Sequence, residues 1–159
     1  MIFNFETAAI IDTIPDTPSC ETQFQIYGKR KKFSGPIRTI KCFRDNGLVK
    51  KIMSSPSKGE VLVIDGNASY FSALMGGMIA KAGMDNGWAG VIINGVIRDS
   101  VEIDQMYFGV KALGTNPKKS SKEGIGELDI PVTFGHVTFQ PGYYVYSDED
   151  GILVTTHLV

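Results

Sequence analysis

The sequence predicts a single mixed α/β domain with a large β component. Two apolar runs at residues 60–64 and 89–94 enclose a helix-like stretch, and this β-α-β order favours parallel strands. Short strand-like runs separated by turn residues fill the last part of the chain, which adds antiparallel structure. A chain of 159 residues with 43% hydrophobic and 21% charged residues fits one globular domain, residues 1–159.

The first part of the chain predicts two helices and one strand. A short amphipathic helix is expected over residues 7–14, ended by Pro15. A loop with the basic run Lys29–Lys32 then leads to a strand at residues 37–42, where alternating apolar residues indicate one buried face. A second helix is expected near residues 47–54.

The middle of the chain predicts helices between buried strands. The strand at residues 60–64 is expected to end in a turn at Asp65-Gly66-Asn67. The next helix covers about residues 78–86 and is stopped by Gly87, a residue typical of the position after a helix C-terminus. The strand at residues 89–94 is followed by a short helix over about residues 100–106 and a strand at residues 110–113.

The last part of the chain changes character. Residues 116–129 form a polar loop that is rich in glycine and lysine. Turn residues at Gly135, Pro141-Gly142 and Asp150-Gly151 then separate short strand-like runs, which together predict a β-meander. The expected strands cover residues 131–134, 136–139, 143–147 and 152–155.

Composition and charge argue against several classes of protein. The net charge of −1 gives no reason to expect a nucleic-acid or anionic-membrane partner. No apolar run approaches the roughly 20 residues of a membrane span. The N-terminal residues lack the basic segment of a signal peptide, so a cytoplasmic location is expected. Cys20 and Cys42 are expected to be free structural thiols, and His136 and His157 lack the spacing of zinc ligands.

The residues best suited to chemistry lie between Gly76 and Glu102. Gly76 and Gly77 precede a helix, so a small anion could approach the free amides of its first turn. Arg98 suits a carboxylate or enolate oxygen, and Asp99 is a hard oxygen ligand suited to magnesium or manganese. If Asp99 opens the short helix, Glu102 faces the same way. These residues would lie beyond the carboxyl end of a strand, where open α/β sheets bind ligands.

A plain structural interpretation of the same residues stays open at this point. Asp99 could be an N-cap with Glu102 as its capping-box partner, and Arg98 could be a surface residue. The two glycines could form an ordinary loop. The lysines of the polar loop, Lys118, Lys119 and Lys122, are expected to be solvated, with the alternative that they screen an anionic substrate.

One spacing and several separated stretches resemble a known family. Gly77, Arg98, Asp99 and Glu102 follow the pattern of a glycine, twenty residues, Arg-Asp, two residues and an acid. Further matching stretches lie at residues 40–46, 61–66, 86–90, 111–114, 124–127 and 132–151. From about residue 5 to 154 the chain therefore resembles the family of the regulator of ribonuclease activity A and the class II 4-hydroxy-4-methyl-2-oxoglutarate aldolases.

The resemblance implies a swivelling β/β/α-type domain with a central mixed sheet or barrel-like β core and flanking helices. It implies a homotrimer with active sites near subunit boundaries. Arg98 would contact the keto or enolate oxygen of a small 2-oxo acid, Asp99 would ligate Mg²⁺ or Mn²⁺, and Glu102 would support the waters of the ion. Four consecutive backbone amides would hold the carboxylate of the substrate: those of Gly76, Gly77, Met78 and Ile79.

The activity implied is that of a divalent-metal-dependent lyase. It would cleave 4-hydroxy-4-methyl-2-oxoglutarate to two pyruvates and decarboxylate oxaloacetate to pyruvate, through a pyruvate enolate stabilised by the metal and Arg98. The base for the 4-hydroxyl proton is either Glu102 or a carboxylate of a neighbouring subunit. The alternative function is a regulator that binds and inhibits ribonuclease E without catalysis. Inhibitory members interrupt the acid after the arginine, whereas this chain retains Asp99.

Overall fold

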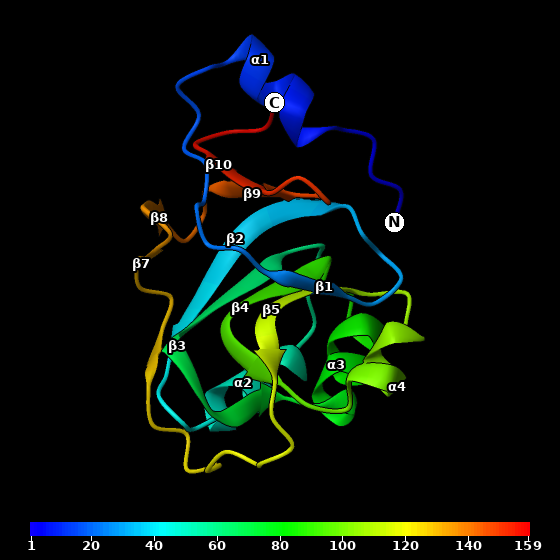
Figure 1. The fold of residues 1–159 in the computed structure, drawn as a ribbon, viewed down its shortest axis with the longest axis vertical. Coiled ribbons are helices and arrows are strands. Elements are labelled where there is room, and N and C mark those ends of the chain that lie inside the picture. The colour runs from blue at the N-terminus through cyan, green and yellow to red at the C-terminus, as the bar shows by residue number, and fades with distance from the viewer.

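The chain is built around one curled sheet of mixed strand direction, in a computed structural model that describes residues 1–159 (Figure 1). Its strands β2, β3, β4 and β5 run parallel, and β1, β9 and β10 extend the sheet with antiparallel pairing. The order across the sheet is β1 (Gln25–Tyr27), β5 (Gly109–Thr115), β4 (Gly90–Ile97), β3 (Val61–Met75), β2 (Phe33–Lys41), β9 (Tyr144–Ser147) and β10 (Ile152–Thr155).

Three short strands and four helices complete the fold. β6 (Glu127–Leu128) pairs with β2, while β7 (Val132–Phe134) and β8 (Val137–Phe139) form a separate hairpin. The helices are α1 (Thr7–Thr13), α2 (Gly47–Met53), α3 (Gly77–Asp85) and α4 (Ser100–Asp104). In Figure 1, α2, α3 and α4 lie in the lower half, and α1 lies at the opposite end beside β9 and β10. No helix in the structure is both long and apolar enough to cross a membrane.

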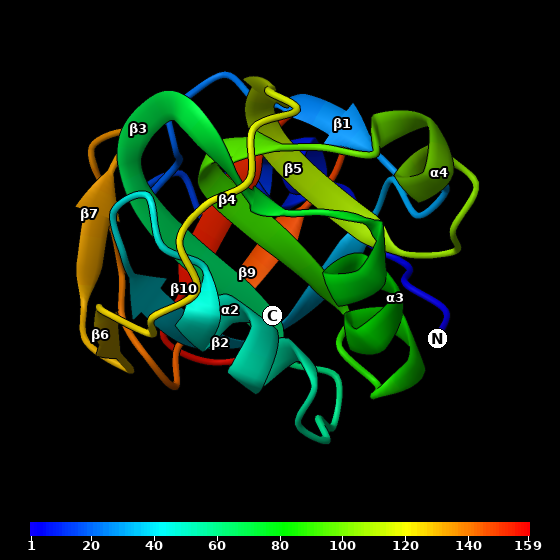
Figure 2. The same ribbon diagram turned by 90° about the horizontal axis from the view of Figure 1, so that it is seen from below.

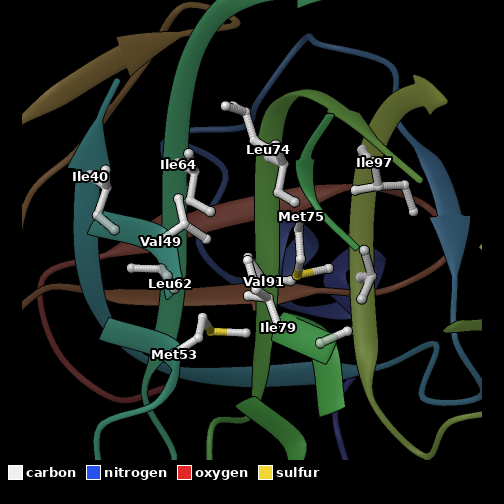
Figure 3. Close-up of a cluster of buried hydrophobic side chains, with 14 of the residues drawn as sticks. Ile40, Val49, Met53, Leu62, Ile64, Leu74, Met75, Ile79, Val91 and Ile97 are labelled. Atoms are coloured by element: carbon white, nitrogen blue, oxygen red, sulfur yellow. The ribbon is translucent and has the colours of Figure 1, made fainter. Parts of the chain in front are cut away.

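The central strands are apolar throughout because both faces of the sheet are covered. Leu62 and Ile64 of β3 point into a core of 19 buried residues that they share with α2 and α3. Val63, between them, belongs to a second core of 14 buried residues on the other face. In Figure 3, Ile40, Leu62 and Ile64 of this core lie near Val49 and Met53 of α2. Burial on both faces explains why these strands lack a polar alternation.

The predicted β-α-β unit is confirmed, since β3, α3 and β4 follow one another and the two strands are parallel. The expected end of β3 at residue 64 is wrong. The strand continues to Met75, and its pairing with β4 shifts register three times after Asp65. The expected turn lies inside this irregular segment, where Asn67 and Ala68 have φ values of 56°. The backbone is irregular at this point, but the chain stays in the sheet and does not leave it.

The predicted β-meander is wrong. β7 and β8 pair only with each other, whereas β9 and β10 join the main sheet through β2. β1 and β6 lie in stretches that were expected to be loops, and β2 begins at Phe33, earlier than expected. The four expected helices are all present. Cys20 and Cys42 are free and buried, as predicted.

Candidate functional site

Four parallel strands end at one edge of the sheet, and the residues that follow them line one cavity. The segment after β2 supplies Asn46, and β3 leads into Gly76 at the start of α3. β4 is followed by Arg98 and Asp99, and the loop after β5 supplies Lys119. Figure 2 shows this edge from below, with the loop after β5 running across the sheet. The cavity measures about 110 Å³, and it lies where open parallel sheets bind ligands.

Asp99 is held by the glycine turn that precedes α3. Its Oδ2 accepts a hydrogen bond of 2.8 Å from the backbone amide of Gly77. Asp99 immediately precedes α4, but its side chain makes no capping bond there. The alternative that Asp99 and Glu102 form a capping box is therefore wrong. Asp99 also has a left-handed backbone, with φ at 57°, a conformation that is uncommon for a residue other than glycine.

The carboxylate of Glu102 lies against the Cα of Gly77. A Cβ atom placed on Gly77 would lie 2.2 Å from Oε2 and 2.5 Å from Cδ of Glu102. A Cβ on Gly76 would lie 2.8 Å from Oδ2 of Asp99 and 3.3 Å from Nε of Arg98. The two glycines are thus required for the close approach of these side chains. Glu102 does not itself line the cavity.

Arg98 is fixed through its backbone and left free at its guanidinium. Its amide donates to the carbonyl of Met75 at 3.0 Å, which ties the end of β4 to the end of β3. The guanidinium makes one long hydrogen bond, 3.5 Å from Nη1 to the carbonyl oxygen of Pro117. None of the three ion pairs in the structure involves Arg98, Asp99 or Glu102. These charges are therefore available to a ligand.

The first turn of α3 offers backbone donors beside Arg98. The amides of the first residues of a helix have no acceptor within the helix. That of Gly77 is used by Asp99, whereas those of Met78 and Ile79 have no acceptor in the protein. The positive end of the helix and the guanidinium thus face one cavity, an arrangement suited to a carboxylate.

The sequence did not predict Asn46 as a site residue, and it predicted Lys119 and Lys122 to be solvated, with the screening of an anionic substrate as the alternative. All three line the cavity. Arg98 and the two lysines oppose the single carboxylate of Asp99 in its wall, so the cavity favours an anion. The position of Asn46 soon after a parallel strand was a signal that could have identified it.

Asp45 holds the lysine loop in place. Its carboxylate accepts hydrogen bonds from the amides of Gly47 at 2.9 Å, Gly124 at 3.0 Å and Glu123 at 3.1 Å. Ser121 adds a hydroxyl donor at 3.3 Å. Burial acts to raise the pKa of Asp45, but these hydrogen bonds outweigh it and hold the pKa below its usual value. One buried carboxylate thus joins the start of α2 to the loop after β5.

The donor set fits a weakly held hard cation and does not fit zinc. No group of three or more His, Cys, Asp or Glu side chains converges in the structure. Asp99 and Glu102 do flank the same glycine, which puts two carboxylates close together. Magnesium is commonly held by one or two protein carboxylates together with substrate and water. Asp99, with Glu102 near it, is therefore adequate for magnesium or manganese.

Comparison with known proteins identifies the family and the fold of the chain. The model of the RraA-like family, described as Aldolase/RraA, matches residues 7–154. A structure from Geobacillus kaustophilus, described as an S-adenosylmethionine:2-dimethylmenaquinone methyltransferase, is 45% identical, with a TM-score of 0.95 over 98% of this chain and 97% of that one. The RNA-processing inhibitor RraA from Thermus thermophilus is 37% identical, with a TM-score of 0.95 over 99% and 96%.

A more distant relative extends the comparison. RraAS2 from Streptomyces coelicolor, described as an unusual member of the RNase ES inhibitor RraA family, is 25% identical. Its TM-score is 0.76, over 94% of this chain and 77% of that one. The curled mixed sheet with few helices is the RraA fold. The chain belongs to the RraA-like family, which includes both aldolases and inhibitors of RNA processing.

Proposed function

We propose that the chain is a divalent-metal-dependent lyase that releases pyruvate from 2-oxo acids. Its substrates would be 4-hydroxy-4-methyl-2-oxoglutarate, cleaved to two pyruvates, and oxaloacetate, decarboxylated to pyruvate and carbon dioxide. The observation that carries the proposal is the meeting of Arg98, Asp99 and Glu102 at Gly76 and Gly77, beside a small cationic cavity.

The residues have distinct tasks in this reaction. The amides of Met78 and Ile79 bind the substrate carboxylate, and Gly77 orients Asp99. Arg98 lies at the keto oxygen, where negative charge develops as the C3–C4 bond breaks and its electrons move towards that oxygen. A divalent ion held by Asp99 would add positive charge at the same oxygen. The resulting pyruvate enolate then takes a proton at C3.

Aldol cleavage also requires removal of the proton from the 4-hydroxyl group. Glu102 is exposed and makes no ion pair, so its carboxylate is free to accept a proton. It lies against Gly77 and not in the wall of the cavity, however. A carboxylate from a neighbouring subunit therefore stays in the proposal as the alternative base. Oxaloacetate loses carbon dioxide without this step.

The size of the cavity favours a small acid over a large ligand. Pockets for drug-sized ligands measure roughly 300–1,000 Å³. A cavity of about 110 Å³ suits a small acid better than a methyl donor that contains a nucleoside.

A homotrimer is part of the proposal. Met78, in the first turn of α3 and in the lining of the cavity, is 86% exposed, and Val101, in the first turn of α4, is 78% exposed. Burial in a subunit boundary would cover them and bring a neighbouring chain to the cavity. Sedimentation at micromolar concentration should give the mass of three chains, and a monomer throughout that range would contradict this assembly.

A second candidate function is supported by the surface near β3. Arg44 lies over the rings of Phe43 and Phe71, with its guanidinium carbon 4.8 and 3.9 Å from their centroids. Phe43, Tyr70 and Phe71 are each about half exposed. Exposed aromatic and arginine side chains are typical of protein–protein contacts. This surface would bind a ribonuclease of the RNase E type in a regulator.

Asp99→Asn separates the two functions. Asparagine tolerates the left-handed backbone and can still accept the amide of Gly77, so the variant should stay folded. A neutral oxygen binds magnesium poorly, and metal-dependent release of pyruvate should be lost. Ribonuclease inhibition, if the chain has it, should survive. Full magnesium-dependent activity in Asp99→Asn would refute the assignment of Asp99 as the metal ligand.

A further inference from the structure

The side chain of Asn46 is buried at the cavity without a hydrogen bond to the protein. Asn46 is 6% exposed, and its Oδ1 is buried without a hydrogen-bond partner. It immediately precedes α2 but makes no side-chain capping bond. Buried polar atoms are nearly always hydrogen-bonded, because an unsatisfied one destabilises the folded state. Since Asn46 lines the cavity, the missing partner is best supplied by a ligand.

The loop that carries the cavity lysines is fixed on both sides. Ser120 donates through Oγ to the carbonyl of Ala73 at 2.7 Å, and its hydroxyl lies 2.8 Å from that of Ser72. On the other side, the amide of Asn46 donates to the carbonyl of Ser121 at 2.8 Å. The backbone of the loop is therefore held against β3 and against the start of α2.

This fixed backbone places two cations at the cavity. Lys119 and Lys122 flank the anchored Ser120-Ser121 pair, and both line the cavity. Neither takes part in any of the three ion pairs of the structure. Lys118 differs from them, because its Nζ lies 4.0 Å from the ring centroid of Phe71 and it does not line the cavity. Lys119 and Lys122 therefore make no ion pair in the protein, whereas Lys118 contacts the ring of Phe71.

The cavity therefore has two groups of ligands for anions. Arg98 directly follows β4, and the first amides of α3 follow the end of β3. The lysines and Asn46 come from the loops after β5 and β2. One carboxylate needs only one of these groups. A ligand with a carboxylate at each end would use both.

We propose that Lys119, Lys122 and Asn46 form a half-site for the second carboxylate of a dicarboxylic 2-oxo acid. The orientation of the substrate rests on the proposed lyase function, in which its 2-oxo carboxylate lies at α3. The two lysines bind the far carboxylate as charges, and the carboxamide of Asn46 donates to it through Nδ2. Oδ1 is then left to accept from a hydroxyl group at C4. These residues select acids with two anionic ends over acids with one.

Two ligands test the half-site without turnover. 2-Oxoglutarate and 2-oxopentanoate share the 2-oxo acid end and a five-carbon chain, and they differ by a carboxylate or a methyl group at C5. Titration calorimetry with excess magnesium should show about tenfold tighter binding of 2-oxoglutarate, the effect of one charged hydrogen-bonded contact. The preference should shrink as salt is raised, because these lysines are exposed.

Variants assign the preference to residues. Lys119→Met and Lys122→Met keep most of the side-chain length but remove the charge, so each should weaken 2-oxoglutarate binding several-fold and leave 2-oxopentanoate unchanged. Lys118→Met is the matched control and should bind both acids as the wild type does. Asn46→Ala should also weaken 2-oxoglutarate binding, with an unfolding midpoint that is unchanged or raised. A structural role for Asn46 would lower that midpoint.

Several outcomes would overturn the half-site. These are equal binding of the two acids by the wild type, no binding of either acid, or the same loss in Lys118→Met as in Lys119→Met. Pyruvate release from oxaloacetate is measured separately. A preference for 2-oxoglutarate without pyruvate release would retain the half-site and reject the lyase. Pyruvate release without a preference for 2-oxoglutarate would retain the lyase and reject the half-site.

Discussion

Replacing Gly77 with alanine tests whether the carboxylate of Glu102 has to lie where it does. The added Cβ would be 2.2 Å from Oε2, whereas ordinary van der Waals contact begins at 3.4 Å. The carboxylate must therefore retreat by about 1 Å, a displacement that can cost on the order of 10²-fold in rate at an active site. This corresponds to about 2.7 kcal/mol in activation free energy. We expect kcat/KM for 4-hydroxy-4-methyl-2-oxoglutarate with magnesium, the substrate whose cleavage needs a base, to fall by that amount.

The stability of Gly77→Ala should change little. The three atoms nearest the new methyl group all belong to Glu102, an exposed and flexible side chain. Alanine also favours the helix by up to about 1 kcal/mol relative to glycine, although less at its first position. Urea denaturation should therefore give a free energy of unfolding within about 1 kcal/mol of the wild type.

A double-mutant cycle shows whether the methyl group acts through Glu102. Once Glu102→Ala has removed the carboxylate, adding Gly77→Ala should have no further effect on kcat/KM. Gly114→Ala is a matched control, because its Cβ would make an ordinary contact of 3.5 Å with Tyr70. Wild-type activity in Gly77→Ala would refute the reasoning. A further large loss in the Glu102→Ala background would show instead that the methyl group blocks the substrate itself.

Two further predictions concern charge. Arg98→Lys should lose about 10²-fold in turnover, because lysine lacks the planar guanidinium. Its stability should be unchanged, because the guanidinium makes only a long hydrogen bond to the carbonyl of Pro117. Near-wild-type kinetics would mean that Arg98 provides only a positive charge without directional hydrogen bonds. Lys111 donates to the carbonyls of Asp148 and Gly151, and burial lowers its pKa from 10.5 to about 8. Between pH 8 and 10.5, Lys111 is more often protonated in the unfolded chain than in the folded one. The free energy of unfolding, relative to that of Lys111→Met, should therefore rise with pH by at most about 1.4 kcal/mol per pH unit. Urea denaturation from pH 7 to 10.5 checks this, and parallel stability curves for the two proteins would contradict it.

The central part of the fold could be predicted because its causes are local. The continuous apolar runs of β3 and β4 arise from burial on both faces, and a helix between two such runs leads to parallel pairing. The return of β3 to the sheet after Asp65 could not be predicted in this way. Residues 67–71 are mostly exposed, residues 72–75 are buried, and neither stretch alternates. The place of these residues depends on pairing with Gly95, Val96 and Ile97 of β4.

The candidate site shows the same difference between residues placed by local sequence and residues placed by long-range contacts. Arg98 and Asp99 directly follow a buried strand, so their place at the edge of the sheet was evident from the sequence. Lys119 and Lys122 lie in a polar loop without apolar periodicity, and the position of that loop is set by hydrogen bonds to Asp45, more than seventy residues earlier. No local pattern reports such a contact. The bond from Gly77 to Asp99 was likewise hidden, because a capping box was an equally good interpretation of Asp-x-x-Glu.

The convergence of four strand ends on one cavity also has a consequence for folding. More than twenty residues of sequence separate Asn46 from Gly76, Gly76 from Arg98, and Arg98 from Lys119. No fragment with fewer than four of these strands can contain the whole cavity, and every contact across it must first overcome the entropy of closing a long loop. Partly folded states should therefore bind no 2-oxo acid even where their helices have formed. In a refolding experiment, ligand binding should appear with the slowest phase of tertiary packing, well after the far-ultraviolet circular dichroism signal has recovered.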